Sequence, residues 1–335
     1  MYILGVESSC DETAAAVVEG SDRILSSVIA SQVEAHKPYG GVVPELASRM
    51  HVEAITPVVT TAIQKAGIAI DDIQAVAATQ GPGLVGALLV GFSFAKAFAW
   101  ARNLPMAGVN HLEAHIHSLL LCRPAPTCPF IALVVSGGHT NIYHVLSDNR
   151  FELMGQTRDD AAGEAFDKVA KTLGLGYPGG PVIEAMAKTS DPGDIVFPRS
   201  LLEKGSFDFS FSGLKSAVAR YVHEHPLKRD LDKARVAAAF QAAVIDVVCE
   251  KLLAAARFQH CRQIGISGGV SANQTLVTAL TRRAARHQIR VIAPPLSLCG
   301  DNAAMVAARG AVMIRDGQTC SLEDDVFSRA LNLSA

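Results

Sequence analysis

The residues best suited to chemistry are two histidines, His111 and His115, four positions apart in a segment whose pattern predicts a helix. Histidines at i and i+4 share one helical face and can bind one metal ion. In the zinc-protease motif HExxH the glutamate directly follows the first histidine, whereas Glu113 lies two residues from each histidine. At about 100° per residue, Glu113 points away from the histidine face and could not serve there as the base. Two imidazoles leave a metal short of ligands, so a carboxylate from elsewhere in the chain is expected; a structural or surface role for the pair is the alternative.

The composition predicts an ordinary globular protein with a substantial core. With 335 residues, 49% of them hydrophobic and 19% charged, the chain is long enough for two domains. A formal net charge of −2 argues against binding nucleic acid by bulk electrostatics, although a local basic patch stays open. Four arginines fit such a patch or an ordinary solvated helix face equally well: Arg282, Arg283, Arg286 and Arg290.

Neither a targeting segment nor a membrane span is indicated. The N-terminal stretch MYILGVE has no basic region and reaches Glu7 after a few apolar residues, so we expect no signal peptide and a cytoplasmic protein. The most apolar run, 84–100, contains Lys96 and is shorter than the roughly 20 apolar residues of a membrane span, so we expect a buried helix. The seven cysteines are scattered without a CxxC pair, which favours reduced thiols over a cysteine metal cluster.

The elements that must position the histidines recur twice along the chain. In the first half we expect strands at 2–6, 13–19 and about 24–29, a helix at 44–65, a strand at 73–78, a helix at 84–102 and a strand at 105–109 before the histidine helix. The second half repeats the beginning of this order, with strands at 130–135, 141–146 and 151–157 and a helix at 160–173. The repeat predicts two βββαβα halves, as in the actin, Hsp70 and sugar-kinase architecture, where two hairpin turns hold nucleotide phosphates. The matching turns are 7–12 and 136–140, although small polar residues also make good hairpin turns without any ligand.

The rest of the second half predicts a glycine-rich site beside further helices. We expect a turn at 176–180, a helix from Pro181, helices at 214–223 and 231–258, strands at 263–266 and 291–293, and a last helix beginning at Asp301. The segment 267–273, SGGVSAN, joins a strand to a helix, and glycines there let backbone N–H groups approach an anion or a flat ring. The polar stretch 189–210 is either a lid or a surface loop.

Nine motifs in one order give the chain a strong family resemblance. They are GVESSCDET (5–13), GGVVPELASR (40–49), GPGLVGALLVG (81–91), HLEAH (111–115), VSGGHT (135–140), DDAAGEAFDKVAKTLGLGYPGGP (159–181), FSFSGLKS (209–216), GGVSAN (268–273) and DNAAM (301–305). Over residues 2–315 the chain resembles the TsaD family, the tRNA N6-adenosine threonylcarbamoyltransferases, once described as O-sialoglycoprotein endopeptidases. The resemblance implies a two-lobed actin-like fold, with 1–125 and a C-terminal helix at about 301–335 forming one lobe and 126–300 the other.

The resemblance implies a metal site made by His111, His115 and Asp301. Two imidazoles and one carboxylate with open positions suit Fe²⁺, which we favour, or Zn²⁺. His117 has no matching role and is taken as a non-ligand. Val134 stands where archaeal relatives have a tyrosine ligand, so the chain resembles the bacterial or organellar type. The tail beyond Gly317 departs from the pattern of many bacterial members.

The resemblance also implies a bound nucleotide, either ATP, ADP or threonylcarbamoyl-AMP. The residues carried over are Val134, Val135, Ser136, Gly137 and Gly138 beside phosphate and metal, Asp167 and Gly180 at the ribose, Glu184 as a weaker ribose match, and Asn273 beside the adenine. Asp167 could instead be a solvated helix residue. In the first turn, Asp11 or Glu12 could accept the proton of the acceptor amine, with a capping or turn role as the alternative; Ser9 is a further candidate.

The implied reaction transfers a threonylcarbamoyl group from threonylcarbamoyl-AMP to N6 of adenosine 37 in tRNAs that read ANN codons, forming t6A at a metal-centred site in the cleft between the lobes. Alternatives are a small-molecule kinase or ATPase of the same fold, a metalloprotease, and a non-catalytic scaffold. A kinase has no use for three converging metal ligands, and the position of Glu113 argues against a protease.

The implied partners are tRNA, a TsaB-like paralogue, a TsaE-like ATPase and a TsaC-like enzyme that supplies the adenylate. The expected docking region is on the helices at 44–65 and 84–102. The second of these is apolar on nearly every face, more than one side of a sheet can bury. A self-dimer covering the same surface is the alternative.

Overall fold

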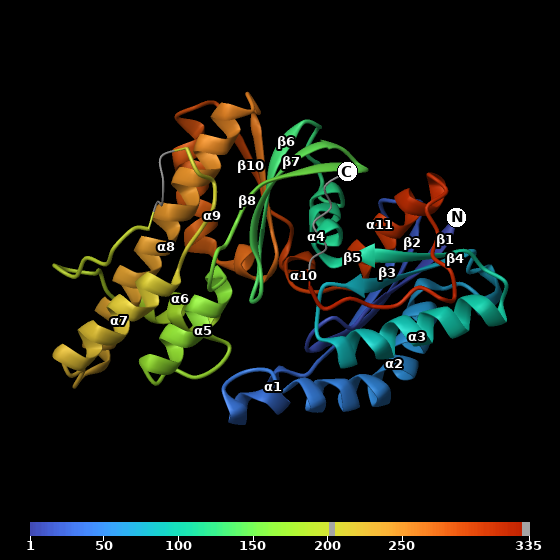
Figure 1. Cartoon of the computed structure of the whole chain (residues 1–335), viewed down its shortest axis with the longest axis horizontal. Coiled ribbons are helices and arrows are strands. Elements are labelled where there is room, and N and C mark those ends of the chain that lie inside the picture. Colours follow the sequence, from blue (N-terminus) through green and yellow to red (C-terminus); the bar gives the residue numbers. More distant parts are fainter. Residues whose placement is uncertain (201–204, 330–335) are drawn as a thin grey trace. The chain divides into compact units, whose positions relative to one another are not determined.

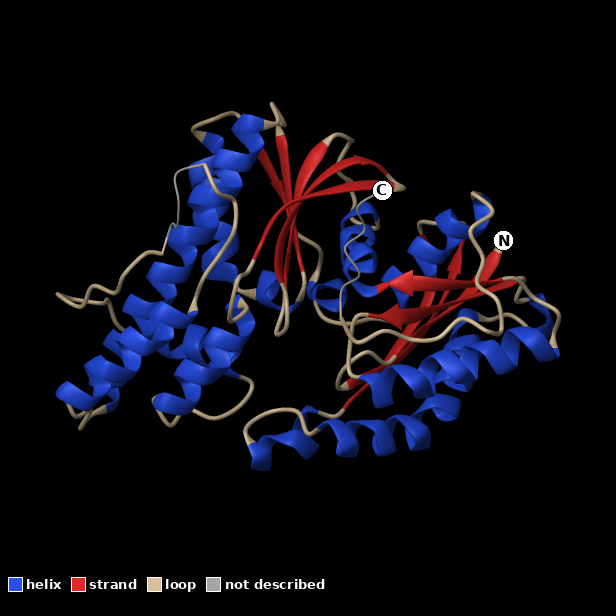
Figure 2. Cartoon of the chain, viewed as in Figure 1, coloured by secondary structure: helices blue, strands red, loops and turns tan. Residues whose placement is uncertain are grey.

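A computed structural model of the chain describes residues 1–200 and 205–329. It divides into two compact units, one made of residues 1–125 with 301–335 and the other of residues 126–300. Each unit contains one five-stranded mixed sheet with helices packed on it (Figures 1 and 2). Among the described residues, no helix is long and apolar enough to cross a membrane.

The first unit is built on a sheet with the strand order β3-β2-β1-β4-β5. Its strands are β1 (Tyr2–Glu7), β2 (Glu12–Glu19), β3 (Arg23–Ser31), β4 (Ala75–Gly81) and β5 (Met106–Asn110). The hairpin strands β2 and β3 run antiparallel to their neighbours, whereas β1, β4 and β5 are parallel. The carboxyl ends of β1, β4 and β5 therefore meet at one edge of the sheet, where the predicted first turn and the histidine helix begin.

Side-chain alternation along β1 assigns its residues to the two faces of the sheet. Leu4 and Val6 join the core under helices α2 and α3. Gly5 faces the other way, and a Cβ atom there would lie 2.3 Å from the carbonyl oxygen of Ala303 at the start of α11. Glu7 shares the face of Gly5, so its carboxylate lies on the side of the sheet that α11 covers.

The helices of the first unit cover both faces of its sheet (Figure 1). They are α1 (Val33–His36), η1 (Lys37–Tyr39), α2 (Pro44–Ala66), η2 (Ile70–Asp72), α3 (Val85–Ala101), α4 (His111–Leu120) and α11 (Ala303–Arg315). The long helices α2 and α3 lie side by side under one face, whereas α4 and α11 lie on the other. The predicted strands and long helices of this unit are confirmed, but the last helix begins at Ala303, with Asn302 as its N-cap, and not at Asp301.

Helix α3 is covered on more sides than the sheet alone provides. Leu88, Phe92 and Ala95 pack on the sheet, and the segment 320–327 runs along another side, tied by hydrogen bonds from the Lys96 ammonium to the backbone oxygens of Leu322 and Asp324. A stripe of α3 stays exposed, with Val85 at 46%, Leu89 at 42% and Trp100 at 71%. The apolar surplus predicted for this helix is therefore partly buried within its own unit.

The second unit has the sheet order β10-β9-β6-β7-β8. Its strands are β6 (Phe130–Val135), β7 (Thr140–Ser147), β8 (Arg150–Gln156), β9 (Gln263–Ser267) and β10 (Arg290–Ile292). Its helices are α5 (Ala162–Thr172), α6 (Gly179–Ala187), α7 (Ser212–Glu224), α8 (Asp230–Phe258), η3 (Gly269–Ala272), α9 (Gln274–Ala285) and α10 (Leu296–Cys299). As β1 does in the first unit, β6 lies between an antiparallel hairpin partner and a parallel neighbour. This correspondence and the two-lobed α/β fold confirm the predicted fold class.

The predicted loop at 189–210 contains no helix or strand in the residues that are described, while 201–204 lie outside them. Its end is anchored to β8, because the backbone N–H of Phe209 donates to the carbonyl oxygen of Gln156 at 2.9 Å and Arg158 donates to Phe209 at 2.9 Å. Residues 207 and 209 also pack their rings into the unit, with Phe209 fully buried. This part of the stretch is fixed structure and does not fit the lid interpretation.

Candidate functional site

The first unit presents His111 and His115 on a helix whose start is fixed by its own cap. Strand β5 ends at Asn110, and the Asn110 side-chain oxygen accepts hydrogen bonds from the N–H groups of Leu112 and Glu113 at 2.9 and 3.4 Å. An asparagine cap satisfies donors that would otherwise lack partners at the helix start. His111 is therefore the first residue of α4, and His115 follows one turn later on the same face. Both imidazoles are buried, with exposures of 5% and 0%.

Asp301 lies against both histidines although it is far away in the sequence. Its Oδ1 atom lies 3.5 Å from Nε2 of His111 and 3.2 Å from Nε2 of His115. Asn302 caps α11 by accepting a hydrogen bond from the N–H of Met305 at 3.0 Å, and this cap fixes the residue before it. One potential ligand atom from each of His111, His115 and Asp301 lies within 4.8 Å of the others. Two imidazole nitrogens and one carboxylate oxygen fit a divalent transition metal with positions left open for other ligands.

The remaining polar residues of α4 point elsewhere. Glu113 forms an ion pair with Arg309 of α11, with Nε and Nη2 each 2.8 Å from the carboxylate. This partly buried pair joins α4 to α11 and directs the Glu113 carboxylate away from the histidine face. His117 is also buried, but it lies outside the ligand group, with Nδ1 3.1 Å from the backbone oxygen of Glu113.

Glu7 is a site residue that the sequence reasoning missed. Its side chain is fully buried at the end of β1, and its Oε2 atom lies 3.1 Å from Nδ1 of His111. The Thr79 hydroxyl donates to the same oxygen at 2.6 Å, and the Ser9 N–H donates to Oε1 at 2.5 Å. The signal was present in the sequence, because a carboxylate that ends an apolar strand is seldom buried unless it is paired.

The charges of this cluster shift the pKa values of its members in different directions. Burial alone would lower the pKa of His111, but the carboxylates of Asp301 and Glu7 raise it to about 9. Burial would raise the pKa of Glu7, yet the charge and hydrogen bond of His111 bring it below the usual value. Burial lowers the pKa of His115 despite its contact with Asp301. The carboxylates of Glu7 and Asp301 therefore favour a positive charge between them, as a bound cation would supply.

The first turn brings the predicted residues Ser9, Asp11 and Glu12 to the same edge of the sheet. Ser9 is buried, with Oγ 3.3 Å from Nδ1 of His111. One carboxylate oxygen of Glu12 accepts a hydrogen bond from Ser31 at 2.8 Å, while the other is buried without a hydrogen-bond partner among the described residues. Burial, with the charges of Asp11 and Asp301, raises the pKa of Glu12 to about 7. Burial also raises the pKa of Asp11.

His51 of α2 contacts both ends of this turn, at Cys10 and Thr13. It was not predicted from the sequence. It is fully buried, with Nε2 2.9 Å from the carbonyl oxygen of Cys10 and Nδ1 2.7 Å from the Thr13 hydroxyl. Burial lowers the pKa of His51, so the ring is neutral and each nitrogen serves one partner. The turn that carries Asp11 and Glu12 is thus held from both of its ends.

In the second unit, the predicted phosphate turn follows β6. Val134 and Val135 are fully buried strand residues, so a ligand contact through their side chains is not available. Gly137 and Gly138 are exposed, and a Cβ atom added to either would meet nothing within 4 Å. The accessible part of the predicted 134–138 segment is therefore Ser136 to Gly138.

Asp167 and Glu184, two other predicted nucleotide residues of this unit, accept hydrogen bonds from neighbouring helices. Asp167 of α5 accepts from the N–H of Gly179 at 2.6 Å, next to Gly180, where a Cβ atom would meet open space. Glu184 of α6 accepts from the N–H and hydroxyl of Thr275, each at 3.1 Å. The N–H of Gly163, at the start of α5, donates to the backbone oxygen of Ser136 at 3.2 Å. The start of α5 therefore contacts the turn after β6, the start of α6 is joined to α5, and the start of α9 is joined to α6.

Asn273 is placed beside this group, but its side chain already has partners. Its Oδ1 atom caps α9 by accepting from the N–H of Leu276 at 2.9 Å, and its Nδ2 atom donates to Gln241 at 2.9 Å. Asn273 as a whole residue is 7% exposed. A contact between Asn273 and an adenine would therefore use its backbone or its outer surface and not a free amide.

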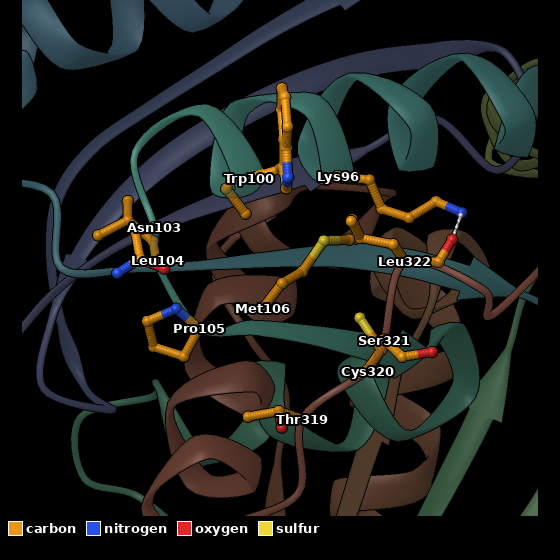
Figure 3. A pocket seen from close by; sticks show the side chains of 11 residues that line it. Lys96, Trp100, Asn103, Leu104, Pro105, Met106, Thr319, Cys320, Ser321 and Leu322 are labelled. Carbon is orange, nitrogen blue, oxygen red and sulfur yellow. Dashed lines mark hydrogen bonds between the residues drawn. The ribbon is translucent and has the colours of Figure 1, made fainter.

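A cavity of about 260 Å³ lies in the first unit, away from the metal candidates. Figure 3 shows it between the end of α3, the residues leading into β5 and the segment 319–322, with Trp100 and Lys96 on its helical side. None of its lining residues belongs to the predicted site. The hydrogen bond from Lys96 to Leu322 ties its two walls together.

Solved structures share the fold at low sequence identity. Component A of the (R)-2-hydroxyglutaryl-CoA dehydratase of Acidaminococcus fermentans aligns with a TM-score of 0.57 and 13% identity, over 94% of this chain and 99% of that one. Full-length HypF, in its phosphate- and nucleotide-bound form, aligns with a TM-score of 0.63 and 13% identity over 98% of this chain and 47% of that one. With its two sheets of corresponding strand order, the chain is an actin-like α/β protein, and its first unit carries a His-His-Asp candidate metal site.

Sequence comparison gives the family within this fold class. The family model described as TsaD, tRNA N6-adenosine threonylcarbamoyltransferase, matches residues 23–308. A protein of that name from Desulforapulum autotrophicum is 63% identical over 98% of this chain and 99% of its own, and one from Bacillus subtilis is 50% identical over 95% and 92%. The chain belongs to the TsaD family of tRNA-modifying transferases, which confirms the family and the enzyme class expected from the motifs.

Proposed function

We propose that the chain transfers the threonylcarbamoyl group of threonylcarbamoyl-AMP to N6 of adenosine 37 in tRNAs that read ANN codons. In this reaction a bond forms between N6 and the carbamoyl carbon, the bond from that carbon to the phosphate oxygen breaks, and AMP leaves with the electron pair. One proton leaves N6. The observation that carries the proposal is the convergence of His111, His115 and Asp301 in a chain of this family.

His111, His115 and Asp301 would hold the metal, Fe²⁺ in the first instance and Zn²⁺ as the alternative. When bound, such an ion polarises a carbonyl oxygen and offsets phosphate charge. The three residues supply two neutral nitrogen donors and one oxygen donor, and the remaining positions stay open to substrate. The cation would take the place of the proton that the two carboxylates stabilise on His111 in its absence.

We assign the role of proton acceptor to Glu12 in preference to Asp11. The free carboxylate oxygen of Glu12 is buried and lacks a hydrogen-bond partner among the described residues, whereas the other oxygen is fixed by Ser31. A pKa of about 7 lies near the operating pH, which is the condition for an efficient general base. Ser9 would help to orient His111.

Gly137 and Gly138 would bind the phosphate of the adenylate through their backbone N–H groups. Ser136 would border it with its side chain, because its N–H donates to the carbonyl oxygen of His139 at 2.8 Å. The open space at both glycines allows an anion to approach the backbone closely. Asp167, Gly180 and Glu184 would border the ribose, and Asn273 the adenine. ATP or ADP would occupy the same place when the adenylate is absent.

We propose that the exposed stripe of α3 and the neighbouring α2 form the docking surface for a TsaB-like paralogue. Val52 on α2 and Leu89 on α3 are exposed at 63% and 42%, and exposed apolar side chains on adjacent helices favour a protein interface. A self-dimer is the alternative occupant. A TsaE-like ATPase and a TsaC-like enzyme that makes the adenylate complete the set of partners, and we place the reaction in the cytoplasm because tRNA is there.

The direct test is reconstitution with defined components. Purified, metal-loaded protein is incubated with unmodified tRNA, threonine, bicarbonate, ATP and the partner enzymes, and the nucleosides are analysed by mass spectrometry. The expected product is t6A, formed in proportion to enzyme and lost on removal of the metal. A tRNA whose position 37 is not adenosine is the matched control. Metal-loaded protein that forms no t6A in the presence of all partners would contradict the proposal.

A further inference from the structure

We propose that Glu7 is a positioning residue of the metal site: its carboxylate holds the Nδ1 proton of His111, so that Nε2 of the same ring is the atom presented to the metal. The inference rests on the proposed metal site and adds to it a residue outside the ligand set. It concerns the metal-binding step and is therefore measurable without the transfer reaction.

The sheet places Glu7 where its side chain has no access to water. The residue ends β1, on the face that α11 covers, and is 0% exposed. A carboxylate removed from water is costly unless it is paired and hydrogen-bonded. The strand itself offers no compensation, so the partners of Glu7 must come from other elements.

Three donors from three segments provide that compensation. The Ser9 N–H donates to Oε1 at 2.5 Å, the Thr79 hydroxyl of β4 donates to Oε2 at 2.6 Å, and Nδ1 of His111 lies 3.1 Å from Oε2. An ionised carboxylate can only accept hydrogen bonds. The proton between the two side chains therefore belongs to Nδ1 of His111.

This contact decides which nitrogen of His111 is left for the metal. A neutral imidazole has one N–H and one lone pair, so a proton held on Nδ1 leaves the lone pair on Nε2. That atom lies 3.5 Å from Oδ1 of Asp301, on the side of the ring where the ligand atoms gather. Carboxylate partners of this kind fix the orientation of a ligand histidine and raise its basicity.

His115 supplies a contrast within the same helix. Its Nε2 atom also faces Asp301, at 3.2 Å, but its Nδ1 atom is buried without a hydrogen-bond partner among the described residues. Only one of the two histidines is thus backed by a carboxylate in the described part of the chain. Metal affinity should accordingly depend on Glu7 through His111 alone.

The experiment compares the full-length wild type with Glu7→Gln in titrations with Zn²⁺ and Co²⁺ against a competing chelator. Glutamine keeps the shape but removes the charge, and we expect the metal affinity to fall by about 10 to 100-fold. Thr79→Val removes one donor to Glu7 and should lower the affinity in the same direction by less. Thr61→Val is the matched control, because it removes a hydroxyl that donates to the carbonyl oxygen of Pro57 on α2 at 2.7 Å and contacts no residue of the site, and the affinity should not change.

Circular dichroism melting of the metal-free variants shows whether Glu7→Gln is folded. A second measurement needs no variant: nitrogen-15 NMR of the histidine rings in the Zn²⁺-loaded wild type should show His111 protonated at Nδ1 and bound through Nε2. Binding through Nδ1, or an unchanged affinity in folded Glu7→Gln, would overturn the role of Glu7 and leave the proposed function standing. A wild type that binds no metal would overturn both.

Discussion

The turn that ends β1 and the turn that follows β6 hold corresponding places in two similar sheets, yet their chemistry is opposite. The first, residues 7–12, carries three carboxylates and contacts the histidine helix. The second, residues 136–138, carries no charge and exposes two glycines with open space around them. The difference teaches that the shared topology supplies the position of a site, while the side chains decide whether a cation or an anion is bound there.

The same contrast extends to the surrounding side chains. Around the first turn, polar groups are left with capacity for a ligand, as in the Glu12 oxygen that has no hydrogen-bond partner among the described residues. Around the second, Asp167, Glu184 and Asn273 are bound to Thr275, Leu276 and other residues of their own unit. There the backbone is what a ligand can reach, and this is the usual arrangement for phosphate.

The largest effect is expected from the proposed metal ligands, because His111 contacts the first turn through Glu7 and Ser9. Asp301→Asn should reduce metal affinity by more than the roughly 10 to 100-fold that loss of an outer partner costs, and t6A formation should be lost with it. His117→Gln is the control, since His117 is buried on α4 with His111 and His115 but lies outside the ligand group. Metal content is measured by elemental analysis and ADP binding by calorimetry. Loss of ADP binding in Asp301→Asn would contradict the assignment of the metal and the nucleotide to different turns.

The next effect is expected at Glu12 and shows as a pH dependence. A general base acts only when ionised, so with a pKa of about 7 transfer activity should fall as the pH drops below 7. Glu12→Gln should lower single-turnover transfer by about 10² to 10⁴-fold and remove that dependence. If the pH profile of transfer activity in Glu12→Gln kept the midpoint of the wild type, another group would be the general base.

The raised pKa of Glu12 also makes the stability of the folded protein depend on pH. Because the folded state raises the pKa of Glu12 from 4.5 to about 7, its contribution to stability is present below pH 4.5 and is lost as the pH rises to about 7. The melting temperature of Glu12→Gln relative to wild type should therefore be higher at pH 8 than at pH 4. An unchanged difference across this window would argue against a raised pKa.

A smaller effect is expected from crowding the second turn. Gly137→Val fits the free protein, because nothing lies within 4 Å of an added Cβ atom, but its side chain would occupy the approach to the backbone N–H groups. ADP affinity should fall by about tenfold or more, roughly 1.4 kcal/mol, while metal affinity stays constant. Gly213→Ala in α7, which also has open space, is the control. An ADP affinity of Gly137→Val equal to that of the wild type would show that the phosphate does not bind at this turn.

The sequence alone was sufficient for most of the fold. Alternating apolar strands, the turns at 7–12 and 136–140 and the long helices gave local signals, so α2 was expected at 44–65 and is found at Pro44–Ala66. The boundary at Asp301 was misplaced because a cap is set by side-chain geometry: Asn302 accepts the N–H of Met305 and leaves Asp301 outside the helix. Short elements such as α10 (Leu296–Cys299) were missed because they are too brief for any periodicity.

The candidate site was harder to predict because its contacts join distant segments. The spacing of His111 and His115 was visible in the sequence, but pairing them with Asp301, 186 positions after His115, depended on the family resemblance. Glu7 was missed because two of its three donors come from β4 and α4, so the sequence signalled it solely through its position at the end of an apolar strand. Asn273 was expected to contact the adenine, but its amide oxygen caps α9. Asparagine before a helix suits either role, so the sequence could not decide between them.

The smallest effect on the site itself is expected from substitutions on the surface of α3. They compare an exposed leucine of the first unit with one of the second. Leu89 lies in the exposed apolar stripe of α3 in the first unit and is 42% exposed; Leu231, at the start of α8 in the second unit, is 43% exposed. Leu89→Asp should weaken assembly with the TsaB-like paralogue by about tenfold, because a charge on an apolar contact must be desolvated. Leu231→Asp should leave assembly unchanged, and neither variant should alter metal content. Sedimentation velocity of the chain alone and with the paralogue measures both outcomes. A wild-type dimer that Leu89→Asp dissociates would identify the self-dimer as the occupant, whereas unchanged assembly in both mixtures would place the interface on another surface.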